Sequence, residues 1–144
     1  MAISPASQSV EHANVAASSD DWLVVWTSNT NGVVYGARVS STGTVRDPQG
    51  IPLTSGANKS YEPAVASNGS DYLVGYSRRV GSFDDDLYIA RVSHAGAVLD
   101  PDGIAVSTAQ WQQSEARLTW GGSEYAVAWT DWRNPSADVR ATRV

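Results

Sequence analysis

The chain of 144 residues contains no cysteine, so neither disulfide bonds nor thiolate metal sites can stabilise it. Basic residues are also scarce: 10 Lys and Arg stand against 15 Asp and Glu, and the net charge is −5. This balance excludes a nucleic-acid backbone binder, which needs a basic face. No apolar run approaches the roughly 18 residues of a membrane span, and no segment keeps a helical period. We therefore expect few or no helices, no nucleic-acid partner and no membrane partner.

An internal repeat of about 50 residues is the strongest feature that is present. Each of three copies has an acidic residue followed by an aromatic one, and a second aromatic residue four positions later, at Trp26, Tyr76 and Trp129. Residues 38–51 match residues 91–104 without a gap, including a D-P-x-G turn. The other repeated positions are three glutamates expected to open the copies and three arginines near the end of each third strand: Glu11, Glu62, Glu115, Arg38, Arg91 and Arg143.

Short runs of β-branched and aromatic residues between turn residues predict strands rather than helices. The second run of each copy is apolar without alternation, as in Trp22–Trp26, so both of its faces are expected to be buried. The predicted strands are Ala13–Ala17, Trp22–Trp26, Val33–Ser40, Ile51–Thr54, Ala64–Ser67, Tyr72–Ser77, Leu87–Ser93, Ile104–Ser107, Ala116–Thr119, Tyr125–Thr130 and Val139–Val144. Ala2–Ser4 precedes the first glutamate as Pro52–Thr54 precedes the second, so it is predicted to be a further short strand.

Four short strands per repeat predict an all-β fold, a β-propeller with one four-stranded blade per repeat. A β-sandwich would not need near-identical units, and a β-solenoid usually has shorter coils. The chain is expected to form a single propeller domain, half of a ring. Its parts are residues 1–10 as the fourth strand of a split blade, 11–54 as blade 1, 62–107 as blade 2, and 115–144 as blade 3 without its fourth strand.

The residues Asp86–Val92 and Tyr61–Ala66 follow the patterns D-[IL]-Y-x-x-R-V and [YS]-E-P-A-V-A. With the D-P-x-G turn, these patterns resemble the repeats of secreted bacterial proteins that form propellers. The first copy departs from the pattern at Val33 and the third at Arg140. The resemblance implies a propeller fold and an extracellular location, and it implies no catalytic residues. The first residues have no basic region and no apolar core, so they are not predicted to be a signal peptide.

Three blades cannot close a ring, because propellers have roughly four or more. An open arc would also expose two apolar blade faces. The simplest closure is a homodimer with about six blades, in which Ala2–Ser4 of one chain completes blade 3 of the other. Alternatively, the chain is a fragment of a longer propeller.

The recurrence of Glu11, Glu62 and Glu115 with the repeated arginines has two interpretations. The three glutamates could form a triplicated ligand site, or each could form a buried, bidentate ion pair that joins the first and third strands of a blade. We favour the ion pairs, because buried charges require partners.

Other residues give weaker indications of chemistry. Asp84–Asp86 could bind calcium, but the segment lacks EF-hand spacing, and a solvated loop is favoured. His12 and His94 have no partner motif, and His94 is expected to be exposed. No nucleophile, P-loop, zinc-protease or sialidase Asp-box motif is present, so neither a metal nor a cofactor is expected.

Tryptophans outside the repeat give the best candidate ligand site. Trp111 and Trp132 are not periodic, and Asp131 and Arg133 flank the second of them. Such side chains can stack on a sugar ring and hydrogen-bond to its hydroxyls. Tryptophan is also enriched at interfaces, and for these residues we slightly favour a place in the seam between chains. We therefore expect a non-enzymatic binding or scaffold module with lectin-like carbohydrate binding. The alternative is a purely structural, self-assembling unit, and a propeller hydrolase or lyase is least favoured because no paired acid and base can be named.

Overall fold

The computed structural model describes all residues 1–144, and it contains eleven β-strands and no helix. It therefore has no helix that could cross a membrane. The strands are β1 (Val10–Ala17), β2 (Asp21–Ser28), β3 (Val33–Ser40), β4 (Ile51–Pro52), β5 (Ser60–Ser67), β6 (Tyr72–Arg79), β7 (Asp85–Val92), β8 (Ile104–Ser107), β9 (Gln113–Trp120), β10 (Tyr125–Asp131) and β11 (Asp138–Arg143).

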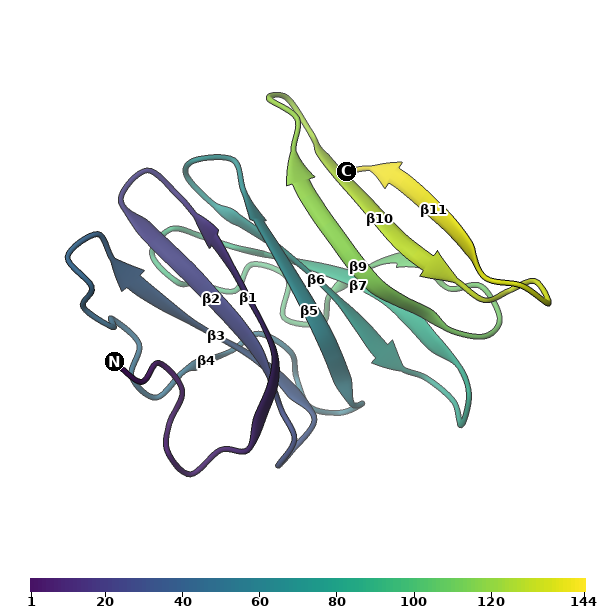
Figure 1. The fold of residues 1–144 in the computed structure, drawn as a ribbon, viewed down its shortest axis with the longest axis horizontal. Coiled ribbons are helices and arrows are strands. Elements are labelled where there is room, and N and C mark those ends of the chain that lie inside the picture. Colours follow the sequence, from purple (N-terminus) through teal and green to yellow (C-terminus); the bar gives the residue numbers. More distant parts are fainter.

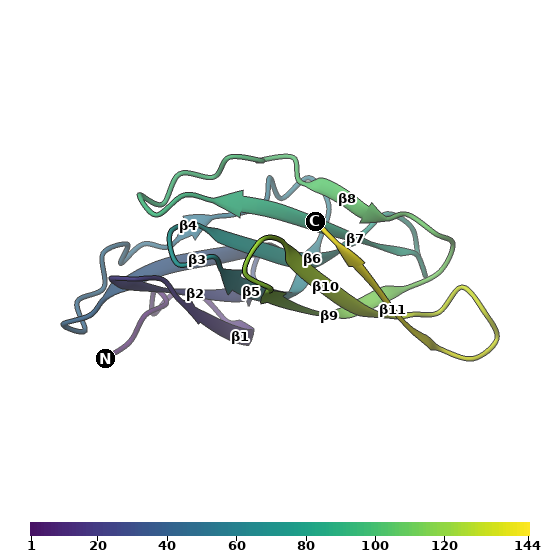
Figure 2. The ribbon, with the colours of Figure 1, turned by 90° about the horizontal axis from the view of Figure 1, so that it is seen from above.

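The strands form three antiparallel sheets, each a meander, as expected for propeller blades. Blade 1 has the order β1-β2-β3-β4, blade 2 the order β5-β6-β7-β8, and blade 3 the order β9-β10-β11 (Figure 1). The predicted three blades, with the third lacking a fourth strand, are confirmed. The first strands β1, β5 and β9 lie side by side on one face of the molecule, while β4 and β8 lie on the far side (Figure 2).

Two apolar layers hold the blades together. The first lies between blades 1 and 2 and includes Leu23, Val25, Tyr72 and Tyr76, all essentially inaccessible to solvent. A second lies between blades 2 and 3, around Leu73, Leu87, Val127 and Trp129. Strand β6 contributes to both layers, which explains why its sequence is apolar without alternation. Strand β10 lies at the end of the arc, and its burial alternates because only one face has a neighbour.

Each first strand carries one irregularity at the same position of the repeat. The register with the second strand shifts between Glu11 and Asn14 in blade 1, and correspondingly in the other two blades. Within these shifts His12, Glu62 and Glu115 adopt φ angles of 53°, 52° and 55°, in the left-handed region that non-glycine residues rarely occupy. In the structure His12, rather than Glu11, is therefore equivalent to Glu62 and Glu115. The predicted alignment of the first repeat is wrong by one residue at this position.

The expected ion pairs between the repeated glutamates and arginines are also wrong. Arg38 forms a bidentate pair with Asp47, with Nε and Nη2 at 2.8 and 2.9 Å from the two carboxylate oxygens. Arg91 pairs with Asp100 in the same way, at 2.8 Å for both bonds. Each aspartate begins a D-P-x-G turn and also accepts the backbone N–H of its arginine, so the pair ties this turn to the third strand. Arg143 follows neither pattern and pairs with Glu124.

Residues 1–9 form no strand within the chain, although Ala2–Ser4 was predicted to be one. Their last part nevertheless follows the repeat. The carbonyl of Ser9 accepts a hydrogen bond from Asn29 N at 2.8 Å, as Lys59 O does from Arg79 N and Gln112 O from Trp132 N. The Gln8 side chain accepts a bond from Trp26 Nε1 at 3.1 Å.

Gly103, which ends the second D-P-x-G turn, is expected to be the most sensitive glycine. Its φ is +72°, and a Cβ at this position would lie 2.2 Å from the hydroxyl of the buried Tyr76. We expect Gly103→Ala to lower the free energy of unfolding by about 2 kcal/mol, from backbone strain and displacement of the ring. Gly43→Ala is the control, because Gly43 has a φ of +81° but no neighbour within 4 Å. Equal losses in urea unfolding would show that the contact with Tyr76 contributes nothing.

Candidate functional site

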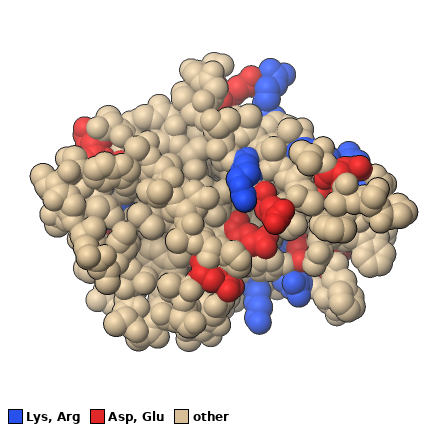
Figure 3. Space-filling view, in the orientation of Figure 1, with Lys and Arg blue, Asp and Glu red and all other residues tan.

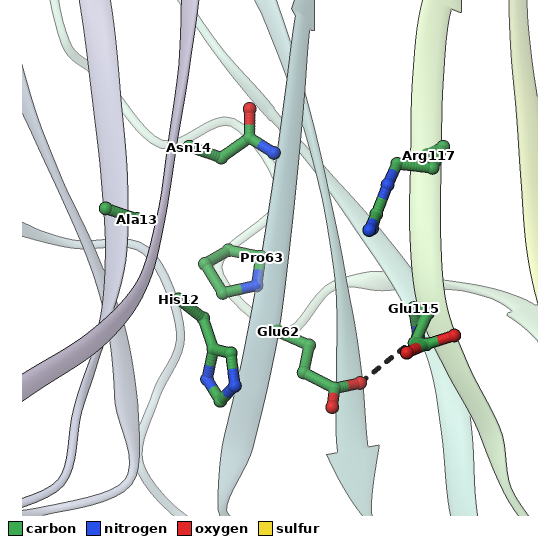
Figure 4. Close-up of a pocket in the computed structure, with 7 residues that line it drawn as sticks. All are labelled: His12, Ala13, Asn14, Glu62, Pro63, Glu115 and Arg117. Atoms are coloured by element: carbon green, nitrogen blue, oxygen red, sulfur yellow. Dashed lines mark hydrogen bonds between the residues drawn. The ribbon is translucent and has the colours of Figure 1, made fainter.

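A polar hollow of about 330 Å³ lies where the three first strands pass one another. Figure 4 shows the side chains of His12, Glu62 and Glu115 in a row across β1, β5 and β9. We call these three residues the axial row. In Figure 3, acidic and basic side chains adjoin one another near the middle of this face, which is otherwise mostly uncharged. The hollow is lined by His12, Ala13, Asn14, Glu62, Pro63, Glu115 and Arg117.

The irregular backbone of the first strands gives the axial row its arrangement. A bulge re-aims the side chain of its extra residue, and bulges of this kind occur often beside functional sites. Here the bulge also frees the backbone N–H of Glu115, which donates to Glu62 Oε2 at 3.1 Å. The Glu115 carboxylate in turn accepts a bond from Thr130 Oγ1 at 3.2 Å. Left-handed backbone at three equivalent non-glycine residues costs of order 1–3 kcal/mol each, and such strain clusters at functional sites.

The axial row joins two carboxylates and one imidazole in a solvent-accessible hollow. His12 and Glu115 are exposed and Glu62 is half-buried, so all three can reach a ligand. Arg117 lines the same hollow and adds a cation, while its Nη1 donates to Ala116 O at 2.8 Å. Two neighbouring carboxylates can supply an acid and a base to the same reacting bond. No group of three or more His, Asp or Glu side chains is close enough to hold a metal ion.

Sequence reasoning found Glu62 and Glu115 but assigned them to ion pairs, and it missed His12, Asn14 and Arg117. The position of His12 could have been found from spacing. His12 precedes Trp22 by the same number of residues as Glu62 precedes Tyr72, whereas Glu11 does not. Arg117 carries no such signal, since the equivalent residues are Asn14 and Ala64.

A second hollow, of about 300 Å³, is lined by exposed aromatic residues and adjoins the start of β9. Phe83 comes from the β6–β7 loop, Trp111 from the β8–β9 connection and Trp132 from the β10–β11 loop. Trp111 and Trp132, the predicted stacking residues, are therefore brought together, and Phe83 joins them. We call these three residues the aromatic rim. Trp111 is only four residues from Glu115, so their Cα atoms are separated by at most about 14 Å.

The other two predicted ligand-binding residues, Asp131 and Arg133, bond to each other. Asp131 is fully buried, and its carboxylate accepts hydrogen bonds from Trp129 Nε1 at 3.0 Å and from Arg133 Nη2 at 2.6 Å. Arg133 also donates to Ser107 Oγ, which ties blade 3 to the last strand of blade 2. Because their polar atoms already bond to each other, we remove Asp131 and Arg133 from the set of candidate ligand-binding residues.

The Arg133 guanidinium and the other donors lower the pKa of Asp131 to about 2. Because the folded-state pKa lies below the unfolded value of 3.8, the stabilisation is complete above about pH 5 and is lost progressively as the pH falls towards 2. The shift corresponds to roughly 2 kcal/mol. The pKa values of Asp47 and Asp100 are also lowered, by Arg38 and Arg91, so the protonation of these two aspartates also lowers the stability as the pH falls.

We therefore expect the stability difference between wild type and Asp131→Asn, measured by urea unfolding, to shrink between pH 5 and pH 2. A constant difference would contradict this account.

Asp84–Asp86 does not form the solvated loop that was expected. Asp85 and Asp86 lie in β7 and are buried. Asp85 forms an ion pair with Arg79, which also donates to Tyr61 Oη at 3.0 Å. Burial and the neighbouring Asp85 raise the pKa of Tyr61 to about 12. This cluster therefore joins β5, β6 and β7 within blade 2.

No family model matches the sequence, and no curated protein matches it either. Solved structures do match the fold. An exo-1,5-α-L-arabinanase from a bovine ruminal metagenomic library aligns with a TM-score of 0.62 at 9% identity, over 92% of this chain and 52% of that one. The α-L-arabinofuranosidase from Lactobacillus brevis aligns with a TM-score of 0.58 at 13% identity, over 97% of this chain and 54% of that one. A neuraminidase-like protein of A/little yellow-shouldered bat/Guatemala aligns with a TM-score of 0.59 at 12% identity, over 95% of this chain and 41% of that one.

The chain thus has a β-propeller fold, as predicted, and spans about half the length of the structures it matches. The same structures correct the functional expectation. A non-enzymatic, lectin-like or purely structural module was expected, but the matching propellers are named as two glycosidases and a neuraminidase-like protein.

Proposed function

We propose that this chain is a propeller unit that hydrolyses glycosidic bonds at the axial row. The observation that carries the proposal is the recurrence of the same strained bulge in all three blades, which presents two carboxylates to one polar hollow. Most glycosidases use a pair of Asp or Glu residues, one as general acid and the other as base or nucleophile. Glu62 and Glu115 supply such a pair, and their adjacency removes the objection that no acid and base could be named.

The remaining polar residues of the hollow have roles consistent with this chemistry. Arg117 and Asn14 offer donors for sugar hydroxyls, and His12 lies beside Glu62 (Figure 4). These residues bind and orient the sugar, while the glutamates move the proton. This proposal replaces the expectation, drawn from sequence alone, that the chain is not an enzyme.

We further propose that the aromatic rim binds the part of the substrate that extends from the hollow. An exposed Phe83, Trp111 and Trp132 around one concavity can stack on pyranose or furanose rings, because each offers an apolar face. The rim and the axial row both lie near the start of β9, so one oligosaccharide can contact both. This arrangement favours a polysaccharide over a small glycoside.

The names of two matching structures favour arabinose-containing polysaccharides as the first substrates to test. An extracellular location, which the resemblance to secreted bacterial propeller repeats implies, would place the protein where such polysaccharides occur. The test is the release of reducing ends from linear arabinan, with xylan and cellulose beside it. Release from arabinan by the folded wild-type chain is expected. No release from any of the three would contradict the proposal.

We expect Trp111→Ala to raise KM for arabinan by about tenfold, with kcat little changed, because stacking on an exposed ring contributes of order 1 kcal/mol to substrate binding. Val80→Ala is the control, because Val80 is an exposed apolar residue of the β6–β7 loop that does not line the aromatic hollow. The measurement is the rate of reducing-end release against arabinan concentration. A fall in kcat at unchanged KM would place Trp111 outside the binding surface.

A further inference from the structure

The two end blades expose residues that the middle blade buries. On blade 1, Val15 is 56% exposed, whereas Val65 at the same repeat position is 7% exposed. Trp22 is likewise 39% exposed and its equivalent Tyr72 only 1%. Because the residues are alike and only the neighbour differs, this surface has the composition of a blade–blade interface. We call Val15, Trp22 and the half-buried Val24 the blade-1 end face.

Blade 3 exposes the other kind of face, the one that in blades 1 and 2 packs against the following blade. Val139 is 83% exposed, although its equivalents Val34 and Leu87 are fully buried. Ala126 and Ala141 lie on the same side of the sheet and are also exposed. We call Val139, Ala126 and Ala141 the blade-3 end face.

The two end faces are complementary. Each interface between neighbouring blades of the chain is formed by one face of the blade-1 type and one face of the blade-3 type. The layer between blades 1 and 2 packs Leu23 and Val34, which correspond to the blade-3 end face, against Val65 and Tyr72, which correspond to the blade-1 end face. The two end faces lie at opposite ends of the arc, so they cannot meet within one chain (Figure 1). Two copies, however, can each offer both faces, and two such contacts close a symmetric ring.

The first residues of the chain match an unpaired strand edge in the same way. Ser4 precedes His12 by the spacing with which Thr54 precedes Glu62 and Ser107 precedes Glu115. Met1–Ser4 therefore occupies the repeat position of a fourth strand, and β11 has no fourth strand beside it. In blade 1 this pairing includes Leu53 N donating to Val34 O at 2.8 Å and Val34 N donating to Thr54 Oγ1 at 3.2 Å.

We propose that two copies of this chain associate end face to end face into one ring of about six blades. Met1–Ser4 of each copy forms the fourth strand of the other copy's blade 3, with Ile3 N donating to the carbonyl of the partner's Val139. A second axial row then faces the first across the ring, so the hollow is enclosed only in the dimer. The proposal does not depend on the reaction at the axial row.

The test is the mass of the 144-residue chain in solution by size-exclusion chromatography with light scattering. We expect twice the chain mass of 15.3 kDa. Val139→Asp and Val15→Asp each place an unpaired charge in the interface and are expected to raise the dimer Kd at least about 100-fold. Val80→Asp, on an exposed loop residue away from both end faces, is expected to leave the mass unchanged.

A second pair of variants tests the strand exchange. Ile3→Pro removes the N–H that the shared strand donates and is expected to weaken the dimer at least about tenfold. Ala6→Pro is its control, because Ala6 is the second residue of a turn closed by Gln8 N and Pro5 O, where proline is favoured. A folded monomer for the wild-type chain would overturn the proposal and assign the end faces to other blades. A dimer unaffected by Val139→Asp, or a mass above two chains, would overturn it as well.

Discussion

Glu115→Gln is expected to lower the rate of arabinan hydrolysis by at least about 100-fold, since a positioned acid or base contributes 10²–10⁴ in rate. The amide keeps the shape of the carboxylate and can still accept the bond from Thr130 Oγ1. What it loses is the ability to exchange a proton, so the loss should appear in kcat with KM little changed. Glu62→Gln is expected to behave alike, because the two carboxylates act on one bond.

The control is Glu124→Gln. Glu124 is also a partly exposed glutamate of blade 3, but it pairs with Arg143 outside the hollow. Its activity should equal that of wild type, and all three variants should show wild-type circular dichroism. If Glu62→Gln and Glu115→Gln retained full activity, or if Glu124→Gln lost it to the same degree, the glycosidase proposal for the axial row would be wrong.

Asp131→Ala is expected to lower the free energy of unfolding by about 3 kcal/mol, the largest stability loss that we predict for a single polar residue. Asp131 is fully buried, and its removal leaves the Nε1 proton of the buried Trp129 without an acceptor. It also frees the Arg133 guanidinium, which then no longer links β10 to Ser107 of β8. The loss of charged bonds and the unpaired donor act in the same direction.

The measurement is urea unfolding at one fixed protein concentration, because association would change the apparent stability. Asp138→Ala is the control. Asp138 is a more exposed aspartate at the start of β11 and lies 3.7 Å from Arg140, so its loss is expected to cost less than 1 kcal/mol. Equal losses for the two variants would show that burial of the Asp131 network contributes nothing.

Much of the fold could be predicted because the same pattern of strand and turn residues occurs three times in the sequence. Trp26, Tyr76 and Trp129 mark the second strands, and the absence of alternation around them correctly placed β6 between two neighbours. Glycine and aspartate-proline turns marked the strand ends. The strand predicted at Ala2–Ser4 does not form within the chain, because the unpaired third strand, β11, lies at the other end of the arc.

The ion pairs and the site were less accessible to sequence reasoning. Arg38 and Arg91 each recur together with a glutamate and with the aspartate of a D-P-x-G turn, so the sequence alone does not select the partner. In the structure the turn places Asp47 and Asp100 within hydrogen-bond distance of the two arginines. The axial row depends on a bulge, whose left-handed residues have no composition that marks them. The gathering of Phe83, Trp111 and Trp132 depends on three loops from different parts of the repeat, which no spacing reveals.

Binding of an arabino-oligosaccharide, followed by NMR of the histidine side chains, tests most directly whether the axial row is the functional site. The chain has only two histidines, His12 in the axial row and His94 in the β7–β8 connection, so their signals are easily assigned. Using Glu115→Gln to prevent turnover, we expect the imidazole signals of His12 to shift saturably with ligand while those of His94 stay unchanged. Unchanged His12 signals at high ligand concentration, or shifts confined to His94, would contradict the assignment.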